Sequence, residues 1–240
     1  MEKAHKNGRV LEVTKHITNA AVMKLVDIGV SKSPAGNGVR VRVPPAAPIE
    51  LERADSLSYI VGVALGDGNL SRPNGRAIRL RISCDRRYPR IANEIVSSLE
   101  TLFPDNRISK VQRAGNCFDI SVYSNSLDLW IPWSVGKGSK MQQHARIPAW
   151  ILDNDDYVRR CLKGLIQTDG CMYTDRGYQM VNFTNNSEML ARDVHDALSR
   201  FEYRPRFMIV NNGGFTKYTT RVARRSEVAR LIKDLELYKE

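Results

Sequence analysis

The chain has 240 residues, of which 42% are hydrophobic, and its formal net charge is +11 at pH 7. This apolar fraction excludes wholesale disorder, and no apolar run is long enough to span a membrane. The four cysteines are scattered, so neither a disulfide framework nor a zinc site is indicated. Without a targeting signal, we expect a soluble protein of the cytoplasm (associated with the nucleoid) or of an organelle.

The basic excess indicates a class of partner. It persists beyond residue 50, where 29 Lys and Arg stand against 22 Asp and Glu. An excess of this size commonly accompanies a polyanion, above all nucleic acid. The alternative on charge alone is a merely basic soluble protein.

Residues 1–54 are expected to form a poorly ordered N-terminal extension. Gly, Pro and Ser interrupt the stretch from Ser31 to Pro48, which leaves room only for a short helix near Thr14–Val26. The peptide Val41–Pro48 resembles the translation of the end of a transfer-RNA gene. The extension is therefore interpreted as a read-through or a wrongly assigned start, and the nucleotide sequence would decide this.

Ordered protein is predicted from Asp55, as a first unit over 55–155 and a second over 156–240. Alternating arms around turn residues predict hairpins, and apolar stripes of helical period predict helices. In the first unit, the elements after the opening helix are expected at Asn69–Arg72, Ala77–Ser83, Pro89–Phe103, Arg107–Arg113, Cys117–Tyr123 and Leu127–Trp133. In the second, they are expected at Asp155–Ile166, Cys171–Asp175, Tyr178–Asn182, Glu188–Phe201, Arg206–Asn211, Thr216–Val222 and Ser226–Leu237.

One segment occurs twice, as Ile60–Gly68 and again 102 positions later as Leu162–Gly170. Both copies are apolar helices that end in Asp-Gly. Small residues face one side of each, and we assign them to the helix–helix interface because they let two backbones approach closely. These interface residues are Gly62, Gly66, Gly164 and Thr168. Two such helices are expected to cross at a pseudo-twofold axis.

The acids that end these helices, Asp67 and Asp169, lie in an unfavourable place. A carboxylate at a helix C-terminus faces the negative end of the helix dipole, and two packed helices bring the acids together. Mg²⁺ would relieve both problems, and two metals would stabilise the oxygens of a phosphodiester hydrolysis. The alternative for a single copy is a plain helix-ending turn.

The hairpin arms carry many basic and amide side chains, which suit a DNA major groove and its phosphates. A solvated sheet face is the alternative. The candidate DNA-binding residues are Asn69, Arg72, Arg76, Arg79, Arg81, Arg107, Lys110, Gln112, Arg113, Tyr173, Gln179, Asn182, Arg206, Asn211, Lys217 and Arg221.

The two motifs and the doubled element order resemble the two-motif, single-chain LAGLIDADG homing endonucleases. The resemblance implies an α+β fold of two pseudo-symmetric αββαββα subdomains with the motif helices packed at their interface. It implies two DNA-binding sheets that form a saddle, a monomer on double-stranded DNA, and cleavage of both strands. It assigns the metal, Mg²⁺ with Mn²⁺ as a substitute, to Asp67 and Asp169, with secondary contacts at Gly66 and Thr168.

The family often places a basic residue after the third helix of each half, where it polarises water or phosphate. Lys137 or Lys140 fits this role in the first half. In the second half the pattern is blurred, with Lys239 as a candidate and Gln179 or Asn182 as substitutes. A nicking enzyme is therefore an alternative to a double-strand endonuclease.

The leading function is a site-specific, metal-dependent double-strand DNA endonuclease that acts in the mobility of an intron or similar element. An RNA maturase that binds intron RNA, or a non-cleaving DNA-binding protein on the same scaffold, is the first alternative. A basic structural protein associated with RNA is the second, and it gives no reason for the repeated acids.

Overall fold

A computed structural model describes residues 48–238. The expected helix near Thr14–Val26, nearly all of the suspected read-through peptide, and Lys239 lie outside the described residues. The first described helix, α2, spans Pro48–Asp67, so regular structure begins before the expected start at Asp55. The reason is a tertiary contact: Arg53 is buried and donates a hydrogen bond of 3.2 Å to the Leu102 carbonyl. Within residues 48–238, no helix is long and apolar enough to cross a membrane.

The first half follows the predicted order closely. After α2 its elements are β1 (Gly68–Ser71), a 3-10 turn η1 (Pro73–Gly75), β2 (Arg79–Asp85), α3 (Pro89–Leu102), β3 (Ser109–Gln112), β4 (Cys117–Tyr123) and α4 (Leu127–Trp130). A short helix that the sequence did not predict, α5 (Ala149–Leu152), leads into the second half. It follows Pro148, which is the N-cap residue and has an extended backbone.

The second half repeats this order. Its elements are α6 (Asp155–Thr168), β5 (Gly170–Asp175), β6 (Tyr178–Asn185), α7 (Glu188–Arg200), β7 (Arg206–Asn212), β8 (Phe215–Val222) and α8 (Arg225–Asp234). The Asn154 side chain caps α6 by accepting from the amides of Asp156 and Tyr157. β6 is longer than predicted because Phe183 to Asn185 continue the pairing with β8.

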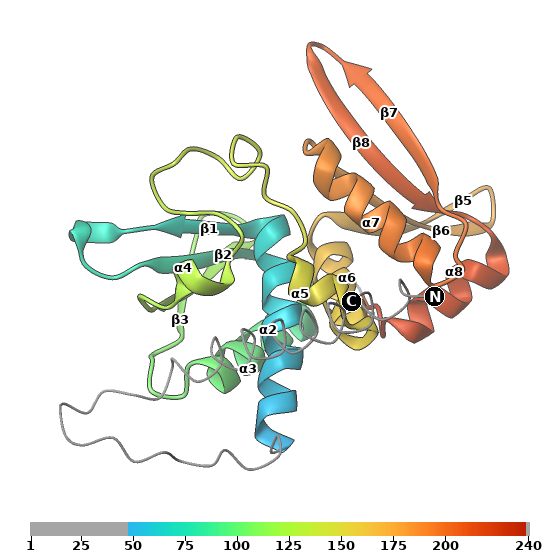
Figure 1. The fold of residues 1–240 in the computed structure, drawn as a ribbon. Coiled ribbons are helices and arrows are strands. Elements are labelled where there is room, and N and C mark those ends of the chain that lie inside the picture. Colours follow the sequence, from blue (N-terminus) through green and yellow to red (C-terminus); the bar gives the residue numbers. More distant parts are fainter. Residues whose placement is uncertain (1–47, 239–240) are drawn as a thin grey trace, which may run out of the picture.

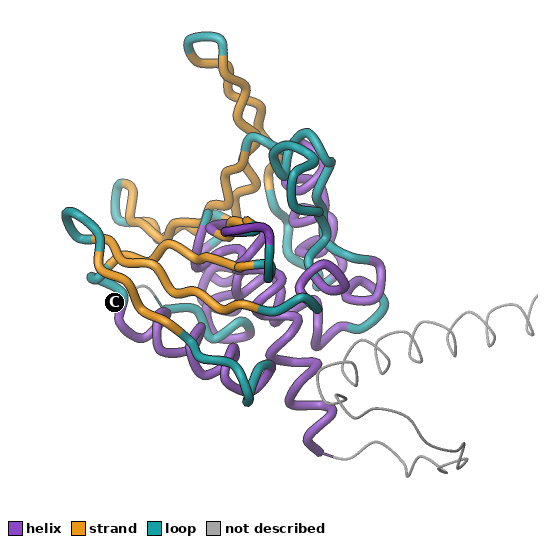
Figure 2. Tube along the Cα trace, turned by 90° about the vertical axis from the view of Figure 1, so that its left-hand side faces the viewer, coloured by secondary structure: helices purple, strands orange, loops and turns teal. Residues whose placement is uncertain are grey.

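Each half holds one four-stranded antiparallel sheet, in the order β1-β2-β4-β3 and β5-β6-β8-β7. The two orders are equivalent strand by strand, which confirms the predicted α+β fold of two αββαββα-like halves. The sheets lie on either side of the paired helices α2 and α6, and the β7–β8 hairpin stands away from the body (Figures 1 and 2).

Strand alternation gives each sheet one helix-covered face and one face turned away from the helices, which we call the open face. In β2, Leu80, Ile82 and Cys84 are buried on the covered face, whereas Arg79 and Arg81 alternate with them. In β6, Val181 and Phe183 are buried on the covered face, and Asn182 lies between them on the open face. This alternation decides which polar side chains can face a common ligand.

Candidate active site and nucleic-acid interface

The two motif helices cross with almost no space between their backbones. A Cβ atom built on Gly62 would lie 2.2 Å from the Cys161 carbonyl oxygen. One built on Gly164 would lie 2.6 Å from the Tyr59 carbonyl oxygen. Both glycines are therefore required by close backbone approach, and the crossing fixes where the two helices end.

Near those ends the helices meet through Gly66 and Thr168. A Cβ atom on Gly66 would lie 2.0 Å from the Thr168 hydroxyl oxygen. That hydroxyl is directed back to its own helix, 2.9 Å from the Gly164 carbonyl oxygen. The side chain of Thr168 thus fills the space that the missing side chain of Gly66 leaves.

Each helix then passes directly into a strand through an Asp-Gly pair. A Cβ atom on Gly68 would lie 2.5 Å from the Ala64 carbonyl oxygen, and one on Gly170 would lie 2.4 Å from that of Ile166. Only glycine fits these tight connections. The sharp turn leaves the preceding acids, Asp67 and Asp169, at the ends of the crossed helices.

Asp169 lines a cavity of about 530 Å³ together with Lys140, Asn185 and Lys217. Its carboxylate accepts a 2.6 Å hydrogen bond from the Asn185 amide. Its carboxyl carbon lies 3.5 Å from the position of a Cβ on Gly66. The acid of the second motif is therefore placed against the C-terminus of the first motif helix.

Asp67 is exposed and lines a smaller cavity of about 140 Å³ with Ser83, Cys84, Gln167 and Thr168. This acid is thus placed beside the C-terminus of the second motif helix, the reciprocal of the Asp169 arrangement. Burial, with the charge of Asp67 as a smaller cause, raises the pKa of the Cys84 thiol to about 12. Cys84 is consequently a neutral neighbour of this acid and not a thiolate ligand.

Lys140, in the loop after α4, lies at the C-terminal end of the first motif helix, α2. Its Nζ donates hydrogen bonds to the carbonyls of Ala64 (3.1 Å) and Leu65 (2.8 Å), and also to Gly66, at the negative end of α2. Burial lowers the pKa of Lys140, and the charges of Asp169 and Asp67 oppose that shift. The other predicted candidate, Lys137, is exposed.

The donor set fits a hard divalent cation with few protein ligands. Among the described residues, no group of three or more His, Cys, Asp and Glu could enclose a metal. Mg²⁺ does not need one, because it usually takes one or two carboxylates and completes its shell with phosphate and water. The Gly66 carbonyl accepts from Lys140, so Asp67 and Asp169 are the principal candidate ligands.

The predicted DNA-binding residues divide by sheet face. Strand register places one set on the open faces, namely Asn69, Arg79, Arg81, Tyr173, Asn182, Arg206, Lys217 and Arg221, with Arg113 held beside them at Asp119. It places Lys110, Gln112, Gln179 and Asn211 on the opposite faces, and Arg72, Arg76 and Arg107 lie outside the strands. The list of candidates predicted from the sequence did not separate the two faces of each strand. Strand alternation places four of these residues on the faces opposite to the open-face set.

Two polar residues of this region were not predicted from the sequence. Asn185, at the end of β6, contacts Asp169, and Asp119 in β4 is buried on the open face of the first sheet. For Asp119 the signal was available, since an acid alternates there with buried Phe118 and Ile120. Nothing in the sequence spacing indicated that Asn185 meets Asp169.

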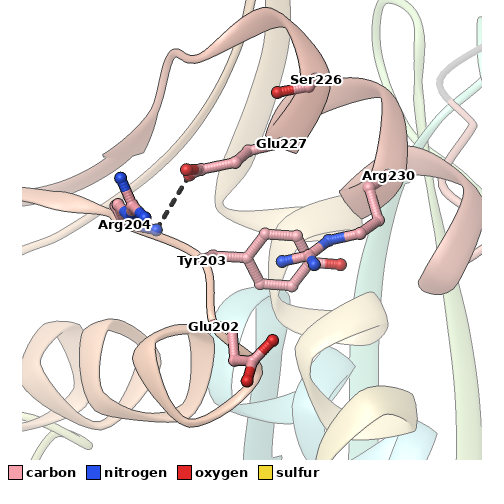
Figure 3. Close-up of a pocket in the computed structure, with 6 residues that line it drawn as sticks. All are labelled: Glu202, Tyr203, Arg204, Ser226, Glu227 and Arg230. Atoms are coloured by element: carbon pink, nitrogen blue, oxygen red, sulfur yellow. Dashed lines mark hydrogen bonds between the residues drawn. The ribbon is translucent and has the colours of Figure 1, made fainter.

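Another cavity lies elsewhere, and Figure 3 shows its lining between the turn after α7 and the start of α8. Its volume is about 620 Å³, and two of its charged side chains, Glu227 and Arg230, already contact neighbouring protein groups. Glu227 accepts from the Arg204 amide at 2.9 Å, and the Arg230 guanidinium covers the Tyr203 ring at 4.3 Å. This cavity presents no catalytic arrangement comparable to the paired acids.

Comparison with known proteins supports the reading of the fold. The sequence-family model that describes a LAGLIDADG-like domain matches residues 156–236. No curated protein matches the chain by sequence.

Two solved structures illustrate the likeness. A variant of I-DmoI in complex with its target DNA in the presence of Mg aligns at 16% identity with a TM-score of 0.57, covering 78% of this chain and 99% of that one. The N-terminal LAGLIDADG domain of DUF199/WhiA aligns at 13% identity with a TM-score of 0.53, covering 92% and 93%.

These identities are low, so the likeness concerns the fold. The first relative is named as a homing endonuclease and the second is not. Residues 156–236 therefore form a LAGLIDADG-like domain, and the described chain as a whole has the fold of the two-motif, single-chain homing endonuclease I-DmoI.

Proposed function

We propose that this protein is a site-specific DNA endonuclease that binds double-stranded DNA as a monomer and hydrolyses phosphodiester bonds with Mg²⁺ or Mn²⁺. The observation that carries the proposal is the reciprocal placement of Asp67 and Asp169, each beside the end of the other motif helix. The I-DmoI structures with target DNA and with Mg or Mn support it by analogy of fold.

In this proposal the two acids hold the metal, which when bound stabilises the charge that develops on the oxygens of the reacting phosphate. The open faces bind the duplex, with the side chains of both sheets directed to the groove and its backbone. The crossed helices keep the acids at a fixed separation through Gly62 and Gly164.

Lys140 acts beside the acids. It lies at the end of α2, in the cavity that Asp169 lines, and its lowered pKa brings proton exchange closer to neutral pH. We assign it to hold or move a proton, or to stabilise phosphate charge, on the side of the first half. No described lysine of the second half bonds the end of α6 in the same way, so the two strands need not be cut at equal rates.

A plasmid that carries the uninterrupted genomic insertion site tests the proposal in the presence of Mg²⁺. The wild-type chain should linearise it, whereas Asp67→Asn and Asp169→Asn should still bind the site but lose cleavage by at least about 100-fold. Cleavage that persists in both variants would refute the metal assignment. A wild type that only nicks would indicate the single-strand alternative.

A non-cleaving DNA-binding protein is the second candidate. It is retained because the DUF199/WhiA domain, which is not named as an endonuclease, also aligns with this fold. Sequence-specific binding without cleavage in Mg²⁺ or Mn²⁺ would support this candidate. Tighter binding of group I intron RNA than of any duplex DNA would instead indicate a maturase.

A further inference from the structure

An acid lies buried among the arginines of the first open face. Asp119 is 6% exposed, although a duplex would have to approach this face. Its carboxylate accepts 2.6 Å and 3.1 Å hydrogen bonds from Arg113 Nε and Ser83 Oγ, and Arg81 Nε lies 3.9 Å away. A negative charge at this place weakens binding to phosphate, so its presence needs a reason.

The second open face holds an arginine in the same manner with a neutral group. Asn182 is 9% exposed, and its Oδ1 accepts a 3.0 Å hydrogen bond from Arg221 Nε. Its Nδ2 donates to the Tyr173 hydroxyl at 3.2 Å, which fixes the orientation of the amide. In both halves, a buried side chain therefore engages the inner nitrogen of an arginine.

This contact decides which donors the arginine can offer to a ligand. A guanidinium has five N–H donors, and donation from Nε uses the one nearest the chain. Among the described residues, the terminal Nη atoms of Arg113 and Arg221 have no hydrogen-bond partner. The free pair of Nη atoms is the fork that donates to O6 and N7 of guanine in the major groove.

We propose that Asp119 and Asn182 are positioning residues that orient Arg113 and Arg221 for guanine recognition, one in each half of the target. The inference rests on the proposed DNA binding but not on cleavage. Holding Nε also restricts a side chain rich in rotamers before DNA arrives, so less entropy is lost on binding. The ligand is a guanine base in each half-site of a duplex.

A duplex library with randomised positions tests this proposal with the full chain and without divalent metal, so that no cleavage occurs. The wild type should select a target with a preferred guanine in each half. Asp119→Ala should lower the preference for one guanine about tenfold, and Asn182→Ala should do so for a guanine in the other half. Arg113→Gln should lose base preference at the target position that the Asp119 variant affects. Arg221→Gln should lose it at the position that the Asn182 variant affects.

The charge difference between the two positioning residues gives a second readout. Asp119→Ala removes a negative charge and should tighten binding to non-specific duplex about threefold while specificity falls. Asn182→Ala changes no charge and should therefore not tighten binding to non-specific duplex. A purely structural role would weaken specific and non-specific binding together, and thermal unfolding of each variant monitors the fold.

Several results would overturn the inference. It fails if the variants of Asp119 and Asn182 retain the wild-type base preferences, or if they lose preference at other positions than the Arg113 and Arg221 variants. Should the two positioning variants not fold, unchanged guanine preference in Arg113→Gln and Arg221→Gln would still refute it. A wild type that selects no sequence overturns the proposed DNA recognition as well, which distinguishes the two failures.

Discussion

The two halves of the molecule share one strand order but fill equivalent positions of their open faces with different chemistry. Where the first half pairs Asp119 with Ser83, the second pairs Thr219 with Thr184 through their hydroxyls at 2.9 Å. Where the first half sets Arg81 opposite Ser121, the second sets Asn182 opposite Arg221. A common backbone therefore carries two different polar surfaces, as a ligand with two unlike half-sites would require.

The interface between the halves shows the opposite tendency, because there equivalent positions keep a similar role. An acid lies at the matching place of the second helix in each half, namely the partly buried Glu94 in α3 and the buried Asp193 in α7. Asp193 accepts from Arg146 and from the Ile147 amide of the connecting segment. Glu94 accepts from Lys163 and Arg160 of the other half. The packing of the halves thus constrains the sequence more than the open faces do.

The largest effect is expected where the backbones touch. Gly62→Ala should destabilise the fold by more than about 4 kcal/mol, because the new methyl group would meet backbone atoms of Cys161 that cannot move aside. In Gly66→Ala the new methyl group would instead clash with the Thr168 side chain. The double variant Gly66→Ala/Thr168→Gly should therefore regain much of the lost stability. Urea unfolding measures all three chains. A Gly62→Ala protein as stable as wild type would disprove the close crossing.

A smaller loss is expected from Glu94→Gln, roughly 3 kcal/mol at pH 7, because Lys163 is only 4% exposed and would lose the nearer of its two carboxylate partners, the other being the exposed Glu236. Burial alone would raise the pKa of Glu94. Hydrogen bonds from Lys163 and Tyr238, and the charges of Lys163 and Arg160, more than offset this and hold the pKa below its usual range.

The sign of the pH dependence follows from that lowered pKa. The folded protein binds fewer protons at Glu94 than the unfolded chain, so the stabilisation is complete above the unfolded pKa of about 4.3. It is lost as the pH falls through the lower folded value. The difference between wild type and Glu94→Gln should therefore shrink in acid, as urea unfolding at several pH values can show. Exposed Glu100→Gln on the same helix is the control, and a difference that grows in acid would contradict this account.

The third prediction addresses the asymmetry of the candidate active site. Lys140→Met should slow cleavage of at least one strand about 100-fold, because it removes the cation beside Asp67 and Asp169. Lys137→Met, in the same loop but exposed, should cleave like wild type. Strand-specific end labels measure the two rates separately. The opposite ranking of the two lysines would show that the wrong one has been assigned.

The smallest effect is expected at the tip of the β7–β8 hairpin, which has no counterpart of equal length in the first half. Phe215 is 71% exposed there, so Phe215→Ser should change the free energy of unfolding by no more than about 0.5 kcal/mol. Thermal unfolding provides the measurement. A loss well above this limit would mean that the tip packs against another part of the chain.

Much of the architecture was predictable because it depends on local pattern. The alternation of Leu80 and Ile82 with Arg79 and Arg81 fixes a strand, and the stripe Ile91, Ile95 and Leu99 fixes a helix, whatever surrounds them. The repeated motif at Asp67 and Asp169 predicted the paired helix ends, since two copies of one unit favour a symmetric packing.

Other features depend on which strands pair and in what register, and only the tertiary structure decided them. The strand register places Lys110 and Gln112 on the face opposite to the open face. Contacts between distant segments place Lys140, and not Lys137, at the end of α2, and they place Asn185 beside Asp169. The burial of Asp119 and Asn182 beside arginines is of the same kind. The alternation of polar and apolar residues determines on which face of its own strand a side chain lies. The side chains beside it on that face come from strands that are distant in the sequence, and the sequence does not show which of these strands pair.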